Sequence, residues 1–169
     1  MNQNKVAARL RRGAVAALAA IAMSGCGSKG GVTVTGILQD PSMYVDTSST
    51  LVGRLNGTFS LHVSLGPGAS EGTDVSIGLG NFTLVDAVSQ TPITVLKLMA
   101  TPEGPYHLEP GKSLDALFTV NDKGPGQLLS KDEQTFLCKS TTTPAISGSI
   151  SDDNGSLPLN SPKFTIRCP

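Results

Sequence analysis

The chain has 169 residues, a length that favours a single domain. Four of the 13 basic residues precede Cys26 and all 13 acidic residues follow it, so nine bases against 13 acids leave the remainder at −4. This mildly acidic body gives no electrostatic basis for binding nucleic acid. The absence of Trp and the presence of only two Tyr and five Phe argue against the platform of stacked rings that many sugar or single-strand binders use.

Residues 1–25 have the three parts of an export signal. The basic part ends at Arg12, an apolar run of eleven residues follows, and two small residues then precede Cys26. The apolar run is too short to cross a bilayer, because a transmembrane helix needs about 20 residues. The leader therefore predicts export of the chain.

The segment Met23-Ser24-Gly25-Cys26 resembles the lipobox of bacterial lipoproteins, with Met23 in place of the more common Leu. The resemblance covers the leader only. It implies a diacylglycerol on Cys26, cleavage before this residue and, usually, a fatty acid on the new amino terminus. Two or more acyl chains hold a protein stably on a membrane. Gly27, where an Asp would often mark inner-membrane retention, points by the same resemblance to the outer membrane of a Gram-negative cell. An ordinary secretory signal with an incidental cysteine is the alternative.

Residues 26–31 are expected to be the lipidated cysteine and a flexible tether, and residues 32–169 a folded domain. The first strand is predicted at Val32–Thr35. The clearest strand is Thr58–Leu65, in which apolar and polar side chains alternate as they do in a strand with one buried and one wet face. Val75–Leu79 also alternates, with its apolar side chains at odd-numbered positions, but the next apolar residues, Phe82 and Leu84, are at even-numbered positions. This change predicts a bulge or bend at 78–80.

Ile93–Met99 is apolar on both parities, which indicates either a central strand or a strand whose second face meets a partner. The remaining expected elements follow in order: a turn at Glu109–Lys112, a strand at Leu114–Val120, Phe136 and Cys138 on one strand face, Ile146 and Ile150 on another, a turn at Asp152–Gly155 and a last strand at Phe164–Cys168. Residues Gln39–Asn56 and Asn121–Gln134 are interpreted as long loops or edge additions.

About eight strands and no amphipathic helical stretch of useful length predict an all-β fold, specifically an immunoglobulin-like antiparallel β-sandwich. The run Leu108–Ser113 resembles a turn that is common in bacterial immunoglobulin-like domains. It covers only a few residues.

Cys138 and Cys168 are predicted to form a disulfide. They are an even pair once Cys26 carries lipid, and an exported protein meets an oxidising compartment. Each is expected late in an alternating strand, with its sulfur in the core, so the bond would fasten the last strand to an earlier one. Two buried free thiols are the alternative.

Three motifs could carry chemistry, and each has a simpler interpretation. Gly68–Gly72 matches G-x-S-x-G, but a strand follows it where a hydrolase elbow needs a helix. His62 and His107 could join the two late cysteines in a zinc site, although no pair has close ligand spacing. The acids of Asp152–Gly155 lack the spacing of a calcium loop. We therefore expect turns, surface histidines, and no metal or other cofactor.

The sequence thus predicts a non-enzymatic structural or binding module, held on the membrane through Cys26, with an envelope protein as the expected partner. The alternative is a small periplasmic enzyme or solute-binding lipoprotein whose site lies in the two long loops. A pocket that joins His107 to an acid would favour the alternative. A flat apolar strip along Ile93–Met99 would favour a partner interface.

Overall fold

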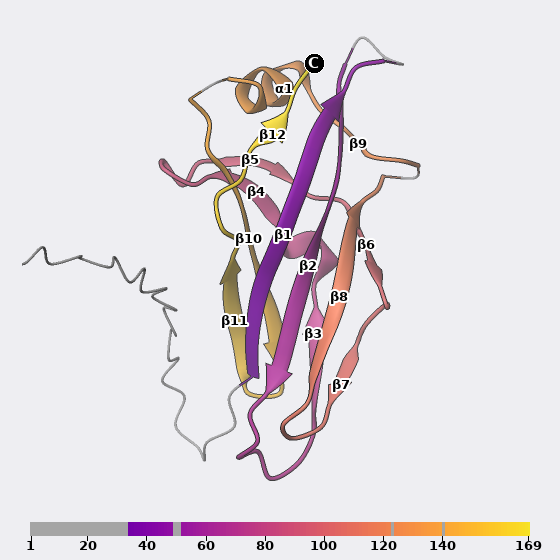
Figure 1. Cartoon of the computed structure of the whole chain (residues 1–169), viewed down its shortest axis with the longest axis vertical. Helices are drawn as coiled ribbons and strands as arrows, with labels where there is room; N and C mark the ends of the chain where they lie inside the picture. The colour runs from indigo at the N-terminus through magenta and orange to yellow at the C-terminus, as the bar shows by residue number, and fades with distance from the viewer. Residues whose placement is uncertain (1–33, 49–51, 123, 140) are drawn as a thin grey trace, which may run out of the picture.

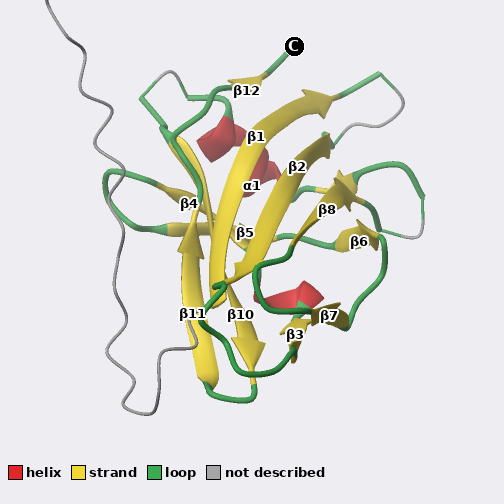
Figure 2. Cartoon of the chain, turned by 60° about the horizontal axis from the view of Figure 1, so that its bottom comes forward, coloured by secondary structure: helices red, strands yellow, loops and turns green. Residues whose placement is uncertain are grey.

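In the computed structural model of the chain, the described residues are 34–48, 52–122, 124–139 and 141–169. The predicted leader, Cys26 and the tether lie outside them. The described part is an all-β sandwich of two mainly antiparallel sheets (Figures 1 and 2), which confirms the predicted fold class. It has twelve strands, more than the eight or so expected, partly because β7, β9 and β12 have only two or three residues each.

Sheet 1 contains the long strands of the molecule and has the order β12-β1-β2-β8-β6, with β9 also paired to β2. Only β1 and β12 run parallel. The strands are β1 (Val34–Asp46), β2 (Arg54–Leu65), β6 (Leu98–Thr101), β8 (Ser113–Val120), β9 (Gln127–Leu128) and β12 (Ile166–Arg167).

Sheet 2 is built around β10. One side of β10 pairs with β11, and the other side pairs with β4 and then β3, which in turn pair with β5 and β7. The turns predicted before β8 and between β10 and β11 are both present. The strands are β3 (Thr73–Ile77), β4 (Thr83–Asp86), β5 (Pro92–Val95), β7 (Tyr106–Leu108), β10 (Pro144–Asp152) and β11 (Gly155–Asn160).

Three phenylalanines join the two sheets at the centre of the core. Phe59 of β2 and Phe118 of β8 stack with their ring centroids 5.0 Å apart, and Phe82 lies 5.6 Å and 5.5 Å from them. Phe82 follows a short 3-10 helix, η1 (Leu79–Asn81), which confirms the predicted bend between β3 and β4. The ring also packs on Gly148 of β10, where any side chain would clash with it.

A β-bulge in β1 changes which side chains face the core. Before the bulge, Val34 and Leu38 are buried, and after it Met43 and Val45 are buried, so the inward parity changes from even to odd. The register with β2 shifts between Gln39 and Ser42. The predicted long loop at Gln39–Asn56 is therefore wrong for most of its length, because the hairpin of β1 and β2 continues through it.

The segment Ile93–Met99 does not form one central strand. β5 ends in sheet 2 and β6 begins in sheet 1, so the chain crosses between the sheets at Leu96 and Lys97. Buried Gln127 satisfies the backbone at this crossing: its side chain accepts a hydrogen bond from the Lys97 amide at 2.8 Å and donates one to the Val95 carbonyl at 2.9 Å. The inward-facing positions stay even-numbered through this change of sheet (Thr94, Leu96 and Leu98 are buried), whereas the apolar side chains of Val95 and Met99 are exposed.

The region around Cys138 is helical, so the strand expected there is wrong. Helix α1 (Lys131–Leu137) begins at Ser130, whose side chain accepts from the Glu133 amide while the Glu133 side chain accepts from the Ser130 amide. This is a capping box, and its S-x-x-E signature is present in the sequence. The period-two interpretation of Phe136 and Cys138 failed because seven residues are too few to show a helical period.

The disulfide between Cys138 and Cys168 is confirmed, with the two Cα atoms 5.7 Å apart. Its position differs from the prediction, because Cys138 ends α1 and is exposed. Cys168 is partly buried and packs against the core, as expected, so the bond fastens the chain after β12 to the exposed end of α1. A closed loop of 30 residues contributes about 3–4 kcal/mol in the loop-entropy model.

The phenylalanine cluster gives the first prediction. Phe82→Ala should lower the free energy of unfolding by about 3–5 kcal/mol, because it leaves a cavity between the sheets that Gly148 cannot fill. Denaturant unfolding of the full chain measures the change. Val88→Ala is the matched control: Val88 is 72% exposed, so its loss should change stability by less than about 0.5 kcal/mol. Equal effects of the two substitutions would contradict the assignment of Phe82 to the core.

Candidate functional site

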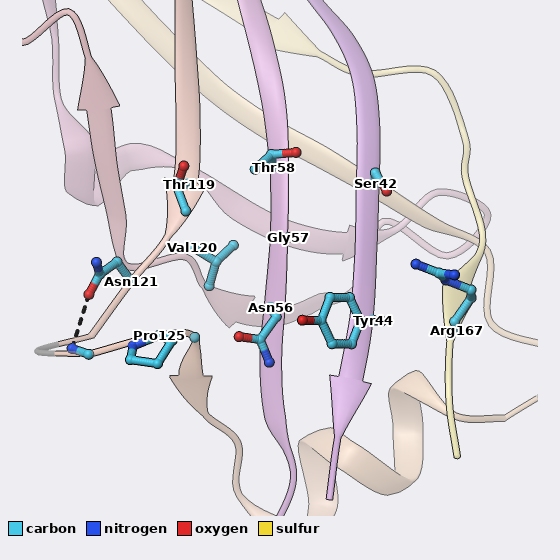
Figure 3. Close-up of a pocket in the computed structure, with 12 residues that line it drawn as sticks. Ser42, Tyr44, Asn56, Gly57, Thr58, Thr119, Val120, Asn121, Pro125 and Arg167 are labelled. Carbon is cyan, nitrogen blue, oxygen red and sulfur yellow. Dashed lines mark hydrogen bonds between the residues drawn. The ribbon is translucent and has the colours of Figure 1, made fainter. Parts of the chain in front are cut away.

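An open hollow of about 570 Å³ lies on the outer face of sheet 1, at the end of the sandwich where β1 finishes (Figure 3). The amino end of β1 is at the opposite end of the molecule (Figure 1). Both of the segments interpreted as long loops contribute to the lining, together with the ends of β8 and β12. The lining residues are Ser42, Tyr44, Asn56, Gly57, Thr58, Thr119, Val120, Asn121, Gly124, Pro125, Gly126 and Arg167.

The floor of the hollow is a row of three hydroxyl side chains, which we call the hydroxyl row: Ser42, Thr58 and Thr119. They are direct cross-strand neighbours, because Ser42 pairs with Thr58 and Thr58 with Thr119. Neighbouring strands place such side chains about 4.8 Å apart. The alternation of β2 and β8 turns Thr58 and Thr119 outward while Phe59 and Phe118 face the core. Ser42 faces outward because the bulge in β1 has reversed the parity.

One wall of the hollow consists of Tyr44 and Arg167. The parallel pairing of β1 with β12 sets these two residues side by side. The guanidinium carbon of Arg167 lies 5.8 Å from the centroid of the Tyr44 ring, and a cation–π contact of this kind at an exposed site contributes about 0.5–1 kcal/mol. The disulfide of Cys168 holds the residue that follows Arg167. The covalent bond therefore helps to fix the position of this wall.

The opposite wall is the chain between β8 and β9. The Asn121 side chain accepts a hydrogen bond from the Gly124 amide at 3.1 Å, and Arg54 donates to the Pro125 carbonyl at 3.4 Å. Gly126 has a φ of +76°, and a side chain there would clash with Asn56. Glycine is required at this position both for the backbone conformation and for the close approach.

Arg167 is the charged residue of the lining. Within the described ranges, no carboxylate lies within ion-pair distance of it, and its guanidinium contacts the ring of Tyr44. The nearest carboxylate along β1 is Asp46, which lies two residues beyond Tyr44 and accepts a hydrogen bond from the Ser48 amide at 2.8 Å. The backbone hydrogen bond from Ser48 lowers the pKa of Asp46, so this carboxylate is ionised at neutral pH.

The two histidines lie away from the hollow, and each is paired with an acid. His62, on the polar face of β2 as expected, contacts Asp115 at 2.7 Å. His107 lies near the opposite end of the sandwich, where its Nδ1 is 2.7 Å from Asp74 and its Nε2 is 3.3 Å from Glu109. The His107 side chain is 59% exposed. The cluster of His107, Asp74 and Glu109 is open to solvent. Both ring nitrogens of His107 contact carboxylates, so neither is free to activate a nucleophile.

The predicted site residues have different outcomes. Cys26 lies outside the described residues. Gly68–Gly72 forms a turn that leads into β3, as expected for a glycine-rich connection. Cys138 and Cys168 are bonded to each other and so are not zinc ligands. Across the described ranges no group of three or more His, Cys, Asp or Glu side chains could hold a metal ion.

Tyr44 and Arg167 were missed by the sequence analysis. Their pairing depends on a parallel contact between the first and last strands, which are more than 100 residues apart in the chain. The only local signal was Asp40-Pro41, which marks an irregularity but does not say whether the strand ends or continues with reversed parity.

In the part of the chain that the structure describes, no helix has the length and apolar character needed to cross a membrane. Comparison of the chain with protein-family models, with curated proteins and with solved structures gave no match.

The histidine cluster gives a second prediction. The hydrogen bond from His107 to Asp74, with a smaller contribution from Glu109, raises the pKa of His107 above its ordinary value. A raised histidine pKa favours the folded state below the unfolded pKa of about 6.5, and this contribution is lost as the pH rises through the folded value. An NMR titration should therefore place the pKa of His107 above about 6.5, and Asp74→Asn should lower it.

Asp115→Asn is the matched control, because Asp115 contacts His62 and leaves the surroundings of His107 unchanged. A His107 titration that Asp74→Asn does not move would show that this ion pair is absent in solution.

Proposed function

We propose that the chain is a lipid-anchored protein of the bacterial cell envelope, attached through Cys26 at the outer membrane, whose β-sandwich acts as a non-enzymatic binding module. The observation that carries the proposal is the position of the hollow. It lies at the opposite end of the sandwich from Val34, where the described chain begins (Figure 1).

The geometry of β1 supports display of the hollow away from a membrane. Tyr44 is ten positions after Val34, which corresponds to about 30 Å of strand. Val34 is eight positions after Cys26, and a chain of this length can span at most about 28 Å. A lipid on Cys26 would hold the end of the sandwich that contains Val34 near the bilayer. The hollow would then lie at the end that points away from the membrane.

The chemistry of the hollow supports binding over catalysis. Among the twelve described residues that line it, none is a histidine or a carboxylate, the side chains that most often act as general acids or bases. The lining instead offers hydroxyl, amide, aromatic and guanidinium groups. These groups hold ligands by hydrogen bonds and by contact with a ring.

The predicted solute-binding alternative is consistent with the same surface, because both segments that were interpreted as long loops line the hollow. The ligand of this module can thus be a small solute or part of a larger envelope component. The other alternative, a small periplasmic enzyme, has no supporting observation among the described residues. His107, which such an enzyme would hold in a pocket with an acid, does not line the hollow and lies on an open surface.

Cys26→Ser tests the anchor. The full chain, expressed with its own leader in a Gram-negative host, should fractionate with membranes, and its mature amino-terminal peptide should carry the mass of a diacylglycerol on Cys26. The variant should lack this mass and accumulate as an uncleaved or mis-sorted precursor, because the acyl chains supply the membrane affinity.

Cys168→Ser, in which the lipid-bearing residue is intact, is the control and should still carry the lipid. If Cys26→Ser matures and partitions into detergent as the wild type does, the chain is not anchored at this residue.

A further inference from the structure

The hydroxyl row presents unused hydrogen-bonding groups on an outer face. Ser42, Thr58 and Thr119 point into the hollow (Figure 3), and none of them has a hydrogen-bond partner among the residues that the structure describes. A hydroxyl group both donates and accepts. Three of them in a row at about 4.8 Å spacing match a ligand that itself carries hydroxyl groups at several positions.

The wall of the hollow adds one aromatic ring and one positive charge. Tyr44 is 42% exposed, and in Figure 3 its hydroxyl points toward Asn56 while Arg167 lies on its other side. The contact with the Tyr44 ring orients the guanidinium of Arg167 and uses none of its five N–H donors. A guanidinium held in this way can bind a carboxylate through two parallel hydrogen bonds.

The floor of the hollow favours side-chain contacts over strand addition. It lies on β1, β2 and β8; β2 and β8 are paired on both sides within sheet 1, and β1 pairs with β12 at Met43 and Tyr44, where it borders the hollow. A ligand on this floor therefore contacts side chains, whereas an extended peptide that adds a strand requires a free edge, which near the hollow is the outer edge of β12. A phosphate polymer is also disfavoured, because it would present several charges to a lining with one arginine.

We propose, on the basis of the binding function above, that the hollow binds a carboxylate-bearing oligosaccharide. Arg167 pairs with the carboxylate, Tyr44 contacts one sugar ring, and the hydroxyl row with Asn56 exchanges hydrogen bonds with the sugar hydroxyls. One ring suffices here because the hydroxyl row and the charge supply the remaining contacts. The scarcity of aromatic residues, which disfavours a stacked platform, is therefore compatible with this mode of sugar binding.

The test uses a tetramer of galacturonic acid and the methyl ester of the same tetramer, which has the same sugar rings without the charge. Calorimetric titration of the full chain, expressed with its leader and purified in detergent, should show saturable binding of the acid and at least tenfold weaker binding of the ester.

Arg167→Gln should weaken binding of the acid roughly tenfold or more, because it removes a charge-assisted hydrogen-bonded pair. Asp46→Asn should tighten it by removing the nearby negative charge.

Lys112→Gln is the matched control, because it removes one positive charge from the turn at the opposite end of the sandwich. It should leave binding unchanged. Thr58→Val keeps the shape of the hydroxyl row and removes one hydroxyl, so it should weaken binding of the acid and of the ester by the same factor.

Several outcomes would overturn the proposal. These are equal binding of acid and ester, unchanged binding by Arg167→Gln, tighter binding of a tetramer of glutamic acid, and no binding at millimolar sugar. The intact mass of the same preparation reports the lipid on Cys26 independently. A lipidated protein that does not bind the sugar would refute this ligand class and leave the anchored module in place.

Discussion

The packing of Phe82 against Phe59 and Phe118 is the interaction on which the sandwich depends. It brings together the ring of Phe82, which directly precedes β4 of sheet 2, and two rings from neighbouring strands of sheet 1. Phe82 reaches this position only because η1 bends the chain between β3 and β4, and because Gly148 leaves space beneath the ring. The two sheets are thereby set at the distance at which the other buried side chains of β1, β2 and β10 also meet.

The same strands that bury this core build the hollow on their outer face. β2 and β8 do so by simple alternation, but β1 needs the bulge near Asp40 to turn Ser42 and Tyr44 outward. The last strand then completes the wall, held beside β1 by parallel pairing and by the disulfide at Cys168. Core and surface site are therefore two faces of one set of strands, so a change of register in β1 would disrupt both.

Alternation and turn chemistry were enough to predict the all-β fold, the row Phe59 to Leu65 and the bend at η1, and the count of cysteines together with the export leader predicted the disulfide. Three features were beyond these signals. The bulge in β1 looks in sequence like the end of a strand, the crossing from β5 to β6 looks like one doubly apolar strand, and α1 is too short to show a helical period. The hollow could not be predicted from alternation or turn chemistry, because Tyr44 and Arg167 become neighbours only when β1 and β12 pair in the folded structure.

In the proposed orientation, the hollow lies away from a bilayer to which the other end of the domain is tethered. Energy transfer from a genetically encoded fluorescent residue to an acceptor lipid tests this directly in vesicles that carry the full-length lipidated chain. Ser156 marks the end of the sandwich near Val34, and Leu128, which is 50% exposed, marks the end with the hollow. We expect markedly more efficient transfer from position 156 than from position 128. Equal transfer, or more efficient transfer from position 128, would contradict the proposed orientation.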